Sequence, residues 1–493
     1  MPPPVEHVTV CILGSGFAGL GAAARLRASG IDDVVVLERA DSVGGTWRDN
    51  TYPGCACDIP SHLYSFSFAP NADWTHTYAR QPEIRAYLER TTTELGLRES
   101  LRMGASVSSC RFDPGTGRWT IEAEDGRRWT ARFLIAGVGA LRDPRVPPLP
   151  GRDTFTGPNF HSSRWDHDVD LAGKRIAVVG TGASAIQVVP AIAETSAEVH
   201  VFQRTPPWVV PRRDRAWTRL ERAMFRSVPG LMRALRASIF WRHDVRYALA
   251  FRQRGPMARA FELLLRWSIR RAVTEPVLRE RVTPDYSPGC KRILISSDWY
   301  PALQRPDVHL HDGGARAIEP DAVVAADGTR IPCDVLVWCT GFRVDDPLGG
   351  LRVEGLDGRD LRTTWGDRPR AHLGVTVPGF PNAFLLLGPN TALGHNSVVV
   401  MIEAQVEYTL QAIRAALSAG PKAWLDVRSE CLDAFIDAVD QRLGGQVWQT
   451  GCHSWYLNAR GENFTIWPGS AAAYVRRMRR FDLADFHVGA PGT

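Results

Sequence analysis

The stretch HVTVCILGSGFAGLGAAARLRASGIDDVVVLE, residues 7–38, decides the fold of this chain. It opens with an apolar run at 7–13, continues through a glycine loop into a helix-prone segment, and ends with a second apolar run at 34–37. The loop contributes Gly14, Gly16 and Gly19. Glycines between a strand and a helix let the backbone approach a pyrophosphate, and an acid ending the next strand accepts a ribose hydroxyl. Because Glu38 stands at that place, the stretch predicts a dinucleotide-binding βαβ unit.

A second unit of the same kind begins with the apolar run 175–179. Its next apolar run, 198–202, is followed by Gln203, Arg204 and Thr205 instead of an acid. An arginine there can bind a 2′-phosphate, so this unit predicts NADPH in preference to NADH. The first unit suits FAD or NAD equally, and its N-terminal place in a two-site chain favours FAD. The predicted contacts of the second unit are Gly180, Thr181, Gly182, Ser184, Ala185, Arg204 and Thr205.

Two dinucleotide sites in one chain imply electron transfer from NADPH to a flavin. The nine cysteines include no C-x-x-C redox pair, so the flavin needs an acceptor other than a disulfide, and O2 is the obvious one. The cysteines are scattered and odd in number, which predicts reduced thiols in a cytoplasmic protein. Cys55 and Cys57 lack a second pair of ligands, so no metal site is expected.

Two further motifs accompany the glycine loops. Residues 155–166 read FTGPNFHSSRWD, or F-x-G-x-x-x-H-x-x-x-W-D, and residues 44–58 read GGTWRDNTYPGCACD, or G-G-x-W-x4-Y-P-G-x3-D. Together they resemble the signatures of type I Baeyer–Villiger monooxygenases, flavoenzymes that use NADPH and O2. The resemblance implies conversion of a ketone to an ester or lactone through a flavin peroxide. The ending Trp165-Asp166 favours this branch over N- or S-oxygenating flavin monooxygenases, which stay open beside a non-oxygenating NADPH oxidase.

The resemblance also assigns residues to the cofactors. Lys291 and Arg292, in the segment SPGCKRILISSDWY at 287–300, would meet the NADP 2′-phosphate and the flavin respectively. Asp58 would touch both FAD and the nicotinamide half of the site. The remaining assigned cofactor contacts are Thr46, Trp47, Tyr64 and Val107, with Trp455 in a late loop that contacts NADP.

Arg292 and Asp58 are the expected catalytic residues. A guanidinium keeps its charge and offers several donors, so it can hold a peroxide anion and the oxyanion formed on the ketone. Asp58 would pair with Arg292 and orient it. We expect His161 to anchor the domains within a hinge at 155–166, and His395 to line the site without a defined role.

The expected fold class is α/β, with two Rossmann-like dinucleotide-binding domains and a helical insertion. The predicted boundaries are 1–150 and 342–493 for FAD, 151–211 and 284–341 for NADPH, and 212–283 for the insert. The insert holds 18 arginines against six acids, a net charge of +12 in a chain whose total is +6. Its helical pattern predicts either a solvated basic face or a membrane-surface patch, and no nucleic-acid module is recognisable.

Overall fold

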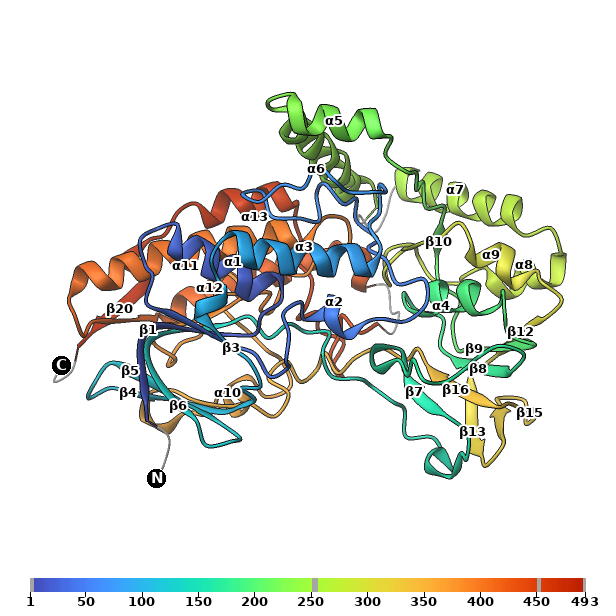
Figure 1. Cartoon of the computed structure of the whole chain (residues 1–493), viewed down its shortest axis with the longest axis horizontal. Helices are drawn as coiled ribbons and strands as arrows, with labels where there is room; N and C mark the ends of the chain where they lie inside the picture. Colours follow the sequence, from blue (N-terminus) through green and yellow to red (C-terminus); the bar gives the residue numbers. More distant parts are fainter. Residues whose placement is uncertain (1–3, 251–255, 450–453, 491–493) are drawn as a thin grey trace.

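The computed structural model describes residues 4–250, 256–449 and 454–490. Two separate sheets lie at opposite ends of the molecule, and helices cover them (Figure 1). Both sheets contain parallel strands with crossover helices, which confirms the predicted α/β fold with two dinucleotide-binding units.

The first sheet has the strand order β17-β4-β5-β6-β1-β2-β3, with β18 paired to β6. Its central strand β1 is buried on both faces, because Val10 and Ile12 belong to the core beneath helix α1 while Cys11 and Leu13 belong to the core on the other side. A strand that is buried on both faces is a continuous run of apolar residues, so this strand can be recognised in the sequence. The strands are β1 (Glu6–Leu13), β2 (Val34–Leu37), β3 (Leu101–Arg102), β4 (Val107–Asp113), β5 (Arg118–Ala123), β6 (Arg128–Ala136), β17 (Arg352–Glu354) and β18 (Ala383–Leu385).

A helical layer covers one face of this sheet (Figure 1). Helix α1 (Phe17–Arg27) follows the first glycine loop and packs against α11 (Val398–Ala419), which in turn packs against α13 (Ala471–Met478). The remaining helices of this half are α2 (Thr46–Asp49), α3 (Gln81–Glu94), α10 (Leu361–Trp365) and α12 (Ser429–Leu443). A small antiparallel ladder joins β19 (Trp424–Val427) to β20 (Phe486–Gly489).

The second sheet is fully parallel, with the order β12-β9-β8-β16-β7. Its strands are β7 (Asn159–His161), β8 (Arg175–Val179), β9 (Glu198–Gln203), β12 (Val308–Asp312) and β16 (Val335–Trp338), with helices α4 (Ala185–Ile192) and α9 (Trp299–Leu303). A three-stranded antiparallel sheet of β13 (Ala315–Glu319), β14 (Ala322–Ala325) and β15 (Arg330–Pro332) stands beside it.

The segment 155–166 differs from its expected form. Asn159–His161 is strand β7, paired with β16 at the edge of the second sheet, so this part of the motif belongs to that sheet. In the segment LLLGPN at 385–390, β18 ends at Leu385 and the remaining residues form the turn that follows.

The insert leaves and rejoins the second half of the molecule at a parallel ladder of β10 (Val209–Val210) and β11 (Leu294–Ile295). It contains α5 (Arg219–Ser227), α6 (Leu231–Ala250), α7 (Pro256–Ala272) and α8 (Pro276–Val282), which lie along the outer edge of the molecule away from the first sheet (Figure 1). No helix in the described part of the chain combines the length and the apolarity that a membrane span requires.

The insert is tied to the first half as well as to the second. Arg236 of α6 donates to the carbonyl oxygens of His62, Leu63 and Ser65 at 3.0, 3.1 and 2.9 Å, and pairs with Glu403 at 3.5 Å. Because charged groups are costly to bury unless they are paired, these contacts fix α6 firmly against the first half.

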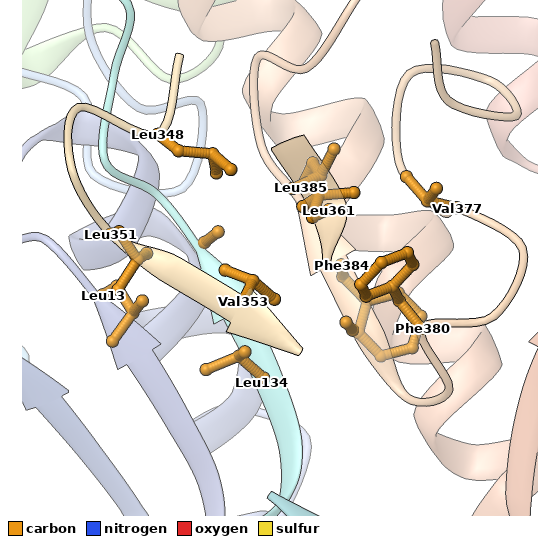
Figure 2. Close-up of a pocket in the computed structure, with 12 residues that line it drawn as sticks. Leu13, Leu134, Leu348, Leu351, Val353, Leu361, Val377, Phe380, Phe384 and Leu385 are labelled. Carbon is orange, nitrogen blue, oxygen red and sulfur yellow. The ribbon is translucent and has the colours of Figure 1, made fainter. Parts of the chain in front are cut away.

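An apolar pocket lies beside strands β1 and β6 of the first sheet (Figure 2). Leu13, Leu134, Leu348, Phe380 and Phe384 are among its lining residues, and all of its lining residues are apolar. Catalytic pockets combine apolar walls with a few polar groups. This pocket therefore offers no side chain for acid, base or anion chemistry.

Candidate active site

The first glycine loop packs against the 44–58 motif. A Cβ on Gly19 would lie 1.8 Å from the carbonyl oxygen of Gly14, so only glycine permits this contact between helix and loop. Gly44 donates its N–H to the carbonyl of Ser15 at 3.0 Å, and a Cβ on Gly45 would lie 3.2 Å from the Cα of Gly16. The two glycine motifs therefore form one surface at the N-terminus of α1.

Glu38 is buried at the end of β2, where the sequence places it. Its carboxylate accepts from the backbone N–H and the hydroxyl of Ser15 at 2.9 and 2.7 Å, and it pairs with Arg48 at 3.0 Å. Burial raises the pKa of Glu38, but Arg48 and Ser15 outweigh it and hold the pKa below its ordinary value. The predicted Val107 begins β4 close by, since Ala105 donates to the carbonyl of Glu38 at 2.7 Å.

Arg48 was missed by the sequence reasoning. It lies within the motif GGTWRD, and its side chain pairs with Asp49 at 2.8 Å as well as with Glu38. The available signal was its position one residue after Trp47, on the single turn of α2 that faces the glycine loop.

The predicted flavin contacts gather around α2. Thr46 is the exposed first residue of this helix, and the Trp47 indole donates to the hydroxyl of Tyr64 at 3.2 Å. The two rings meet edge to face with centroids 5.6 Å apart. Burial raises the pKa of Tyr64 well above its ordinary value, so its hydroxyl stays protonated at neutral pH.

Asp58 and Arg292 form an ion pair between the two halves of the molecule. The Arg292 Nε donates to Asp58 Oδ2 at 3.0 Å, and a second guanidinium nitrogen donates to the same oxygen. The side chain of Arg292 is 28 % exposed and that of Asp58 is 30 % exposed, so both remain accessible. The negative charge of Asp58 raises the pKa of Arg292 above its ordinary value, which secures the positive charge at all working pH values.

The second glycine loop places the two predicted phosphate contacts near each other. Gly180 has φ +111°, and a Cβ there would lie 2.4 Å from the carbonyl oxygen of Cys339. Thr181 donates to the carbonyl of Thr205 at 3.1 Å, next to Arg204. Burial lowers the pKa of Lys291, and the positive charge of Arg204 lowers it further.

The other predicted contacts of the second loop are Gly182, Ser184 and Ala185, which lie at the start of α4. A Cβ on Gly182 would meet no atom within 4 Å. Ser184 precedes α4 and Ala185 is its buried first residue. No other part of the described chain therefore covers the backbone at Gly182, just before α4.

Gln187, on α4, joins the two motifs and was not predicted. Its amide oxygen accepts from the Tyr52 hydroxyl at 3.1 Å and from the Ala56 N–H at 3.3 Å, while its NH2 group donates to the Ala56 carbonyl at 3.1 Å. A Cβ on Gly54 would lie 2.6 Å from the Gln187 carbonyl oxygen. The Tyr52-Pro53-Gly54 turn is thus an interface between the halves.

Gln187→Leu is expected to slow flavin reduction by NADPH at least about tenfold. The variant loses three hydrogen bonds that hold the loop before Asp58 against α4. Each contributes about 1 kcal/mol, and half of their sum already corresponds to about tenfold. Stopped-flow reduction under anaerobic conditions measures this rate. The matched control is Gln411→Leu, whose glutamine makes three hydrogen bonds within the first half, to Glu407, Met478 and Phe481. Equal reduction rates in both variants would rule out the role of Gln187.

In the late loop, Tyr456 is the buried aromatic that faces the Asp58–Arg292 pair, whereas the predicted Trp455 is exposed. Trp455 is 42 % exposed, whereas Tyr456 is 1 % exposed. Burial raises the pKa of Tyr456 to about 12, and the nearby Arg292 and Asp58 act on it in opposite directions. The aromatic ring centroids of the two residues lie 4.4 Å apart. Trp455 and Tyr456 are adjacent in the sequence, and the sequence alone does not indicate which of the two is buried.

His161 is buried at the end of β7. Its Nδ1 accepts the N–H of Ser163 at 3.1 Å, and its ring meets Phe342 at 5.6 Å, at the crossover back to the first half. Burial lowers the pKa of His161 to about 4, so the ring is neutral at neutral pH. These contacts suit an anchor and offer no route for proton transfer. His395 pairs with the buried Asp244 of α6 at 3.4 Å.

The depressed pKa of His161 predicts a pH dependence of stability. The unfolded chain has a histidine pKa near 6.5, so between about pH 6.5 and pH 4 it binds a proton that the folded protein excludes. The free energy of unfolding therefore falls as pH falls through this window, by up to about 1.4 kcal/mol per pH unit for one site. His161→Asn should flatten this slope in urea titrations. The exposed His487→Asn is the control, and an unchanged slope in His161→Asn would contradict the assignment.

The expectation of reduced thiols is wrong at one position. Cys290, directly before Lys291, is disulfide-bonded and fully buried. Among the residues that the structure describes, seven cysteines are free thiols, namely Cys11, Cys55, Cys57, Cys110, Cys333, Cys339 and Cys431. Counting cysteines failed here because a disulfide depends on which thiols the fold brings together.

The sequence and the structure of this chain are similar to those of known monooxygenases. Residues 12–81 match the family described as NAD(P)-binding Rossmann-like domain, and residues 61–215 match the family described as L-lysine 6-monooxygenase/L-ornithine 5-monooxygenase. A Baeyer-Villiger monooxygenase of Streptomyces coelicolor is 48% identical over 487 residues, which cover 99% of this chain and 93% of that protein. A Baeyer-Villiger monooxygenase of Pseudomonas aeruginosa is 41% identical, covering 99% of this chain and 92% of that protein.

Solved structures agree. An oxidized steroid monooxygenase bound to NADP superposes with a TM-score of 0.86 at 28% identity, covering 98% of this chain and all of that one. A cyclohexanone monooxygenase from Rhodococcus sp. Phi1 bound to NADP+ gives a TM-score of 0.87 at 26% identity, covering 99% of this chain and all of that one. The chain therefore belongs to the Baeyer–Villiger monooxygenases, FAD-dependent enzymes that consume NADPH and O2 and oxygenate ketones.

Proposed function

We propose that FAD lies along the first glycine loop and NADPH along the second, with the nicotinamide directed toward the Asp58–Arg292 pair. The shape of both loops supports this placement, because Gly19 and Gly180 occupy positions that no larger residue could take. Residues 1–150 and 342–493 would then hold FAD, and residues 151–211 and 284–341 would hold NADPH.

The individual contacts follow from chemistry. Glu38 and Arg48 would meet the adenosine and pyrophosphate of FAD, and Trp47 and Tyr64 would support its ring system. Lys291 and Arg204 provide two neighbouring cations for a 2′-phosphate, which NADPH has and NADH lacks.

The reaction needs a fixed positive charge where oxygen is transferred. FAD held along the first glycine loop would supply, once reduced by NADPH, the chemistry that activates O2 for insertion beside the ketone carbonyl. Arg292 holds negative charge as it develops on oxygen, and its planar donors are preorganised by the bond to Asp58. The Asp58–Arg292 contact is the single observation that carries this assignment, because it joins an always-charged group of one half to the 44–58 motif of the other.

The substrate we propose is a small-molecule ketone, and the product an ester or lactone. The match of residues 61–215 to lysine and ornithine monooxygenases keeps N-oxygenation as a second candidate. The test supplies the holoenzyme with NADPH and a panel of cyclic, aromatic, linear and steroid ketones, a thioether and a primary amine. Ester formation from a ketone supports the proposal. Oxidation of the thioether or amine alone, or hydrogen peroxide equal to the NADPH consumed, would overturn it.

We also propose a cytoplasmic location, where cellular NADPH is available. The seven free thiols support this location, and the Cys290 disulfide is the observation against which it must be tested. Fractionation of cells expressing the chain would decide it, and recovery in an extracytoplasmic fraction would contradict the proposal.

A further inference from the structure

Helix α7 of the insert is apolar on two opposite faces. Leu265 and Ile269 are buried at 4 and 1 % exposure and pack into the core. On the other side of the same helix, Leu263 and Trp267 are 67 and 55 % exposed. A helix at a protein surface ordinarily turns polar residues outward, so the outer face of α7 lacks the expected pattern.

The same feature recurs on the neighbouring helices. Leu220 on α5 is 72 % exposed, and Trp241 on α6 is 56 % exposed. Helix α5 contacts α6, and α6 contacts α7, so the three helices form one body at the outer edge of the molecule (Figure 1). Of the 16 large apolar residues that are exposed in the described part of the chain, ten lie between residues 220 and 277. Such a concentration marks an interaction surface.

Unpaired arginines accompany these apolar side chains. None of the following exposed arginines has an acidic partner among the described residues: Arg219, Arg233, Arg242, Arg259, Arg270 and Arg271. The acids of α5, α6 and α7 are engaged elsewhere, since Glu221 pairs with Arg215, Asp244 with His395, and Glu262 with Arg266. The surface therefore combines apolar side chains with positive charge that nothing neutralises.

We propose that this surface, formed by the outer faces of α5, α6 and α7, docks on an anionic lipid bilayer. Leucine and tryptophan side chains enter the interface while arginines bind lipid phosphates, which is the pattern of helices that lie on membranes. A second copy of the chain fits less well, because a two-fold contact would bring the same arginines face to face. The contacts of Arg236 with the 62–65 segment make the surface rigid with the enzyme, so docking of the insert carries the whole molecule.

The experiment is co-sedimentation of the FAD-loaded enzyme with vesicles of phosphatidylcholine alone or mixed with phosphatidylglycerol. We expect binding to the mixed vesicles, weak binding to the neutral ones, and a marked loss when salt rises from about 0.1 M to about 1 M, because salt shortens the range of surface charges. The double variant R270E/R271E should weaken binding at least about 25-fold, since each arginine near an anionic surface contributes about fivefold.

The apolar contribution is tested separately with L263S/W267S. Its control is L483S/V488S, which removes two apolar residues of 44 and 49 % exposure outside the insert. The charge control is R479E/R480E, which changes two exposed arginines beyond the end of α13. Only the insert variants should lose vesicle binding, while melting temperatures and NADPH oxidation without vesicles stay unchanged.

Two results would overturn the proposal. One is equal sedimentation of all four variants and the unaltered enzyme. The other is a dimer in analytical ultracentrifugation that L263S/W267S dissociates while vesicles bind neither protein, since the surface would then serve a second copy of the chain.

Discussion

Arg292→Ala abolishes ester formation while NADPH still reduces the flavin at close to the normal rate. This is the largest effect we expect of any single substitution. Removing one preorganised donor from a site of developing negative charge typically slows a reaction by about 10² to 10³-fold. The Arg292 guanidinium donates two hydrogen bonds to Asp58, and the pKa of Arg292 lies above its ordinary value. We therefore expect the decrease in the rate of oxygenation to reach the upper end of this range.

The variant separates two steps because hydride transfer from NADPH needs positioning of the two cofactors but no anion stabilisation by Arg292. Anaerobic stopped-flow measures reduction, and product analysis measures oxygenation. Arg292→Lys is the matched control, because it keeps a positive charge but loses the planar donors that pair with Asp58. We expect an intermediate product yield from it. Full ester yield from Arg292→Ala would contradict the assignment.

Arg204→Ala and Lys291→Ala each lower kcat/KM for NADPH by about 10- to 100-fold and leave kcat/KM for NADH nearly unchanged. A hydrogen bond to a charged group contributes about 1.5 to 3 kcal/mol, and only NADPH carries the 2′-phosphate that forms it. Burial lowers the pKa of Lys291 and the positive charge of Arg204 lowers it further, which is consistent with the two cations serving one phosphate.

The cofactor preference is therefore the decisive readout, since general damage to the site would lower activity with both nucleotides. The matched control is Arg330→Ala, an arginine of β15 that pairs with Glu319. It should leave the preference intact. An unchanged ratio of NADPH to NADH efficiency in both Arg204→Ala and Lys291→Ala would rule out this phosphate site.

Much of the fold could be predicted because its central strands are buried on both faces. The predicted runs 34–37 and 175–179 coincide with β2 and β8, since continuous apolar residues bounded by glycine loops leave little choice. Strand β7 escaped prediction because its three residues show no alternation, and its pairing with β16 depends on a segment far along the chain. Local patterns do not contain that information.

Part of the candidate site could also be predicted from the sequence, and part of it could not. Asp58 and Arg292 stand 234 positions apart, and only the resemblance of two separate motifs brought them together before the structure did. Gln187 was invisible because a polar residue inside a helix ordinarily faces solvent, whereas here it bonds to a loop from the other half. Tyr456 and the Cys290 disulfide were missed for the same reason, since both depend on contacts made only after folding.

Product analysis with labelled oxygen tests the central claim most directly. The FAD-loaded enzyme is supplied with NADPH, ¹⁸O2 and the ketone panel, and the products are examined by mass spectrometry. If the chain oxygenates ketones at Arg292, a ketone yields an ester or lactone that carries one ¹⁸O atom, and Arg292→Ala yields none while still consuming NADPH. Labelled hydrogen peroxide as the sole product of the unaltered enzyme would contradict the account.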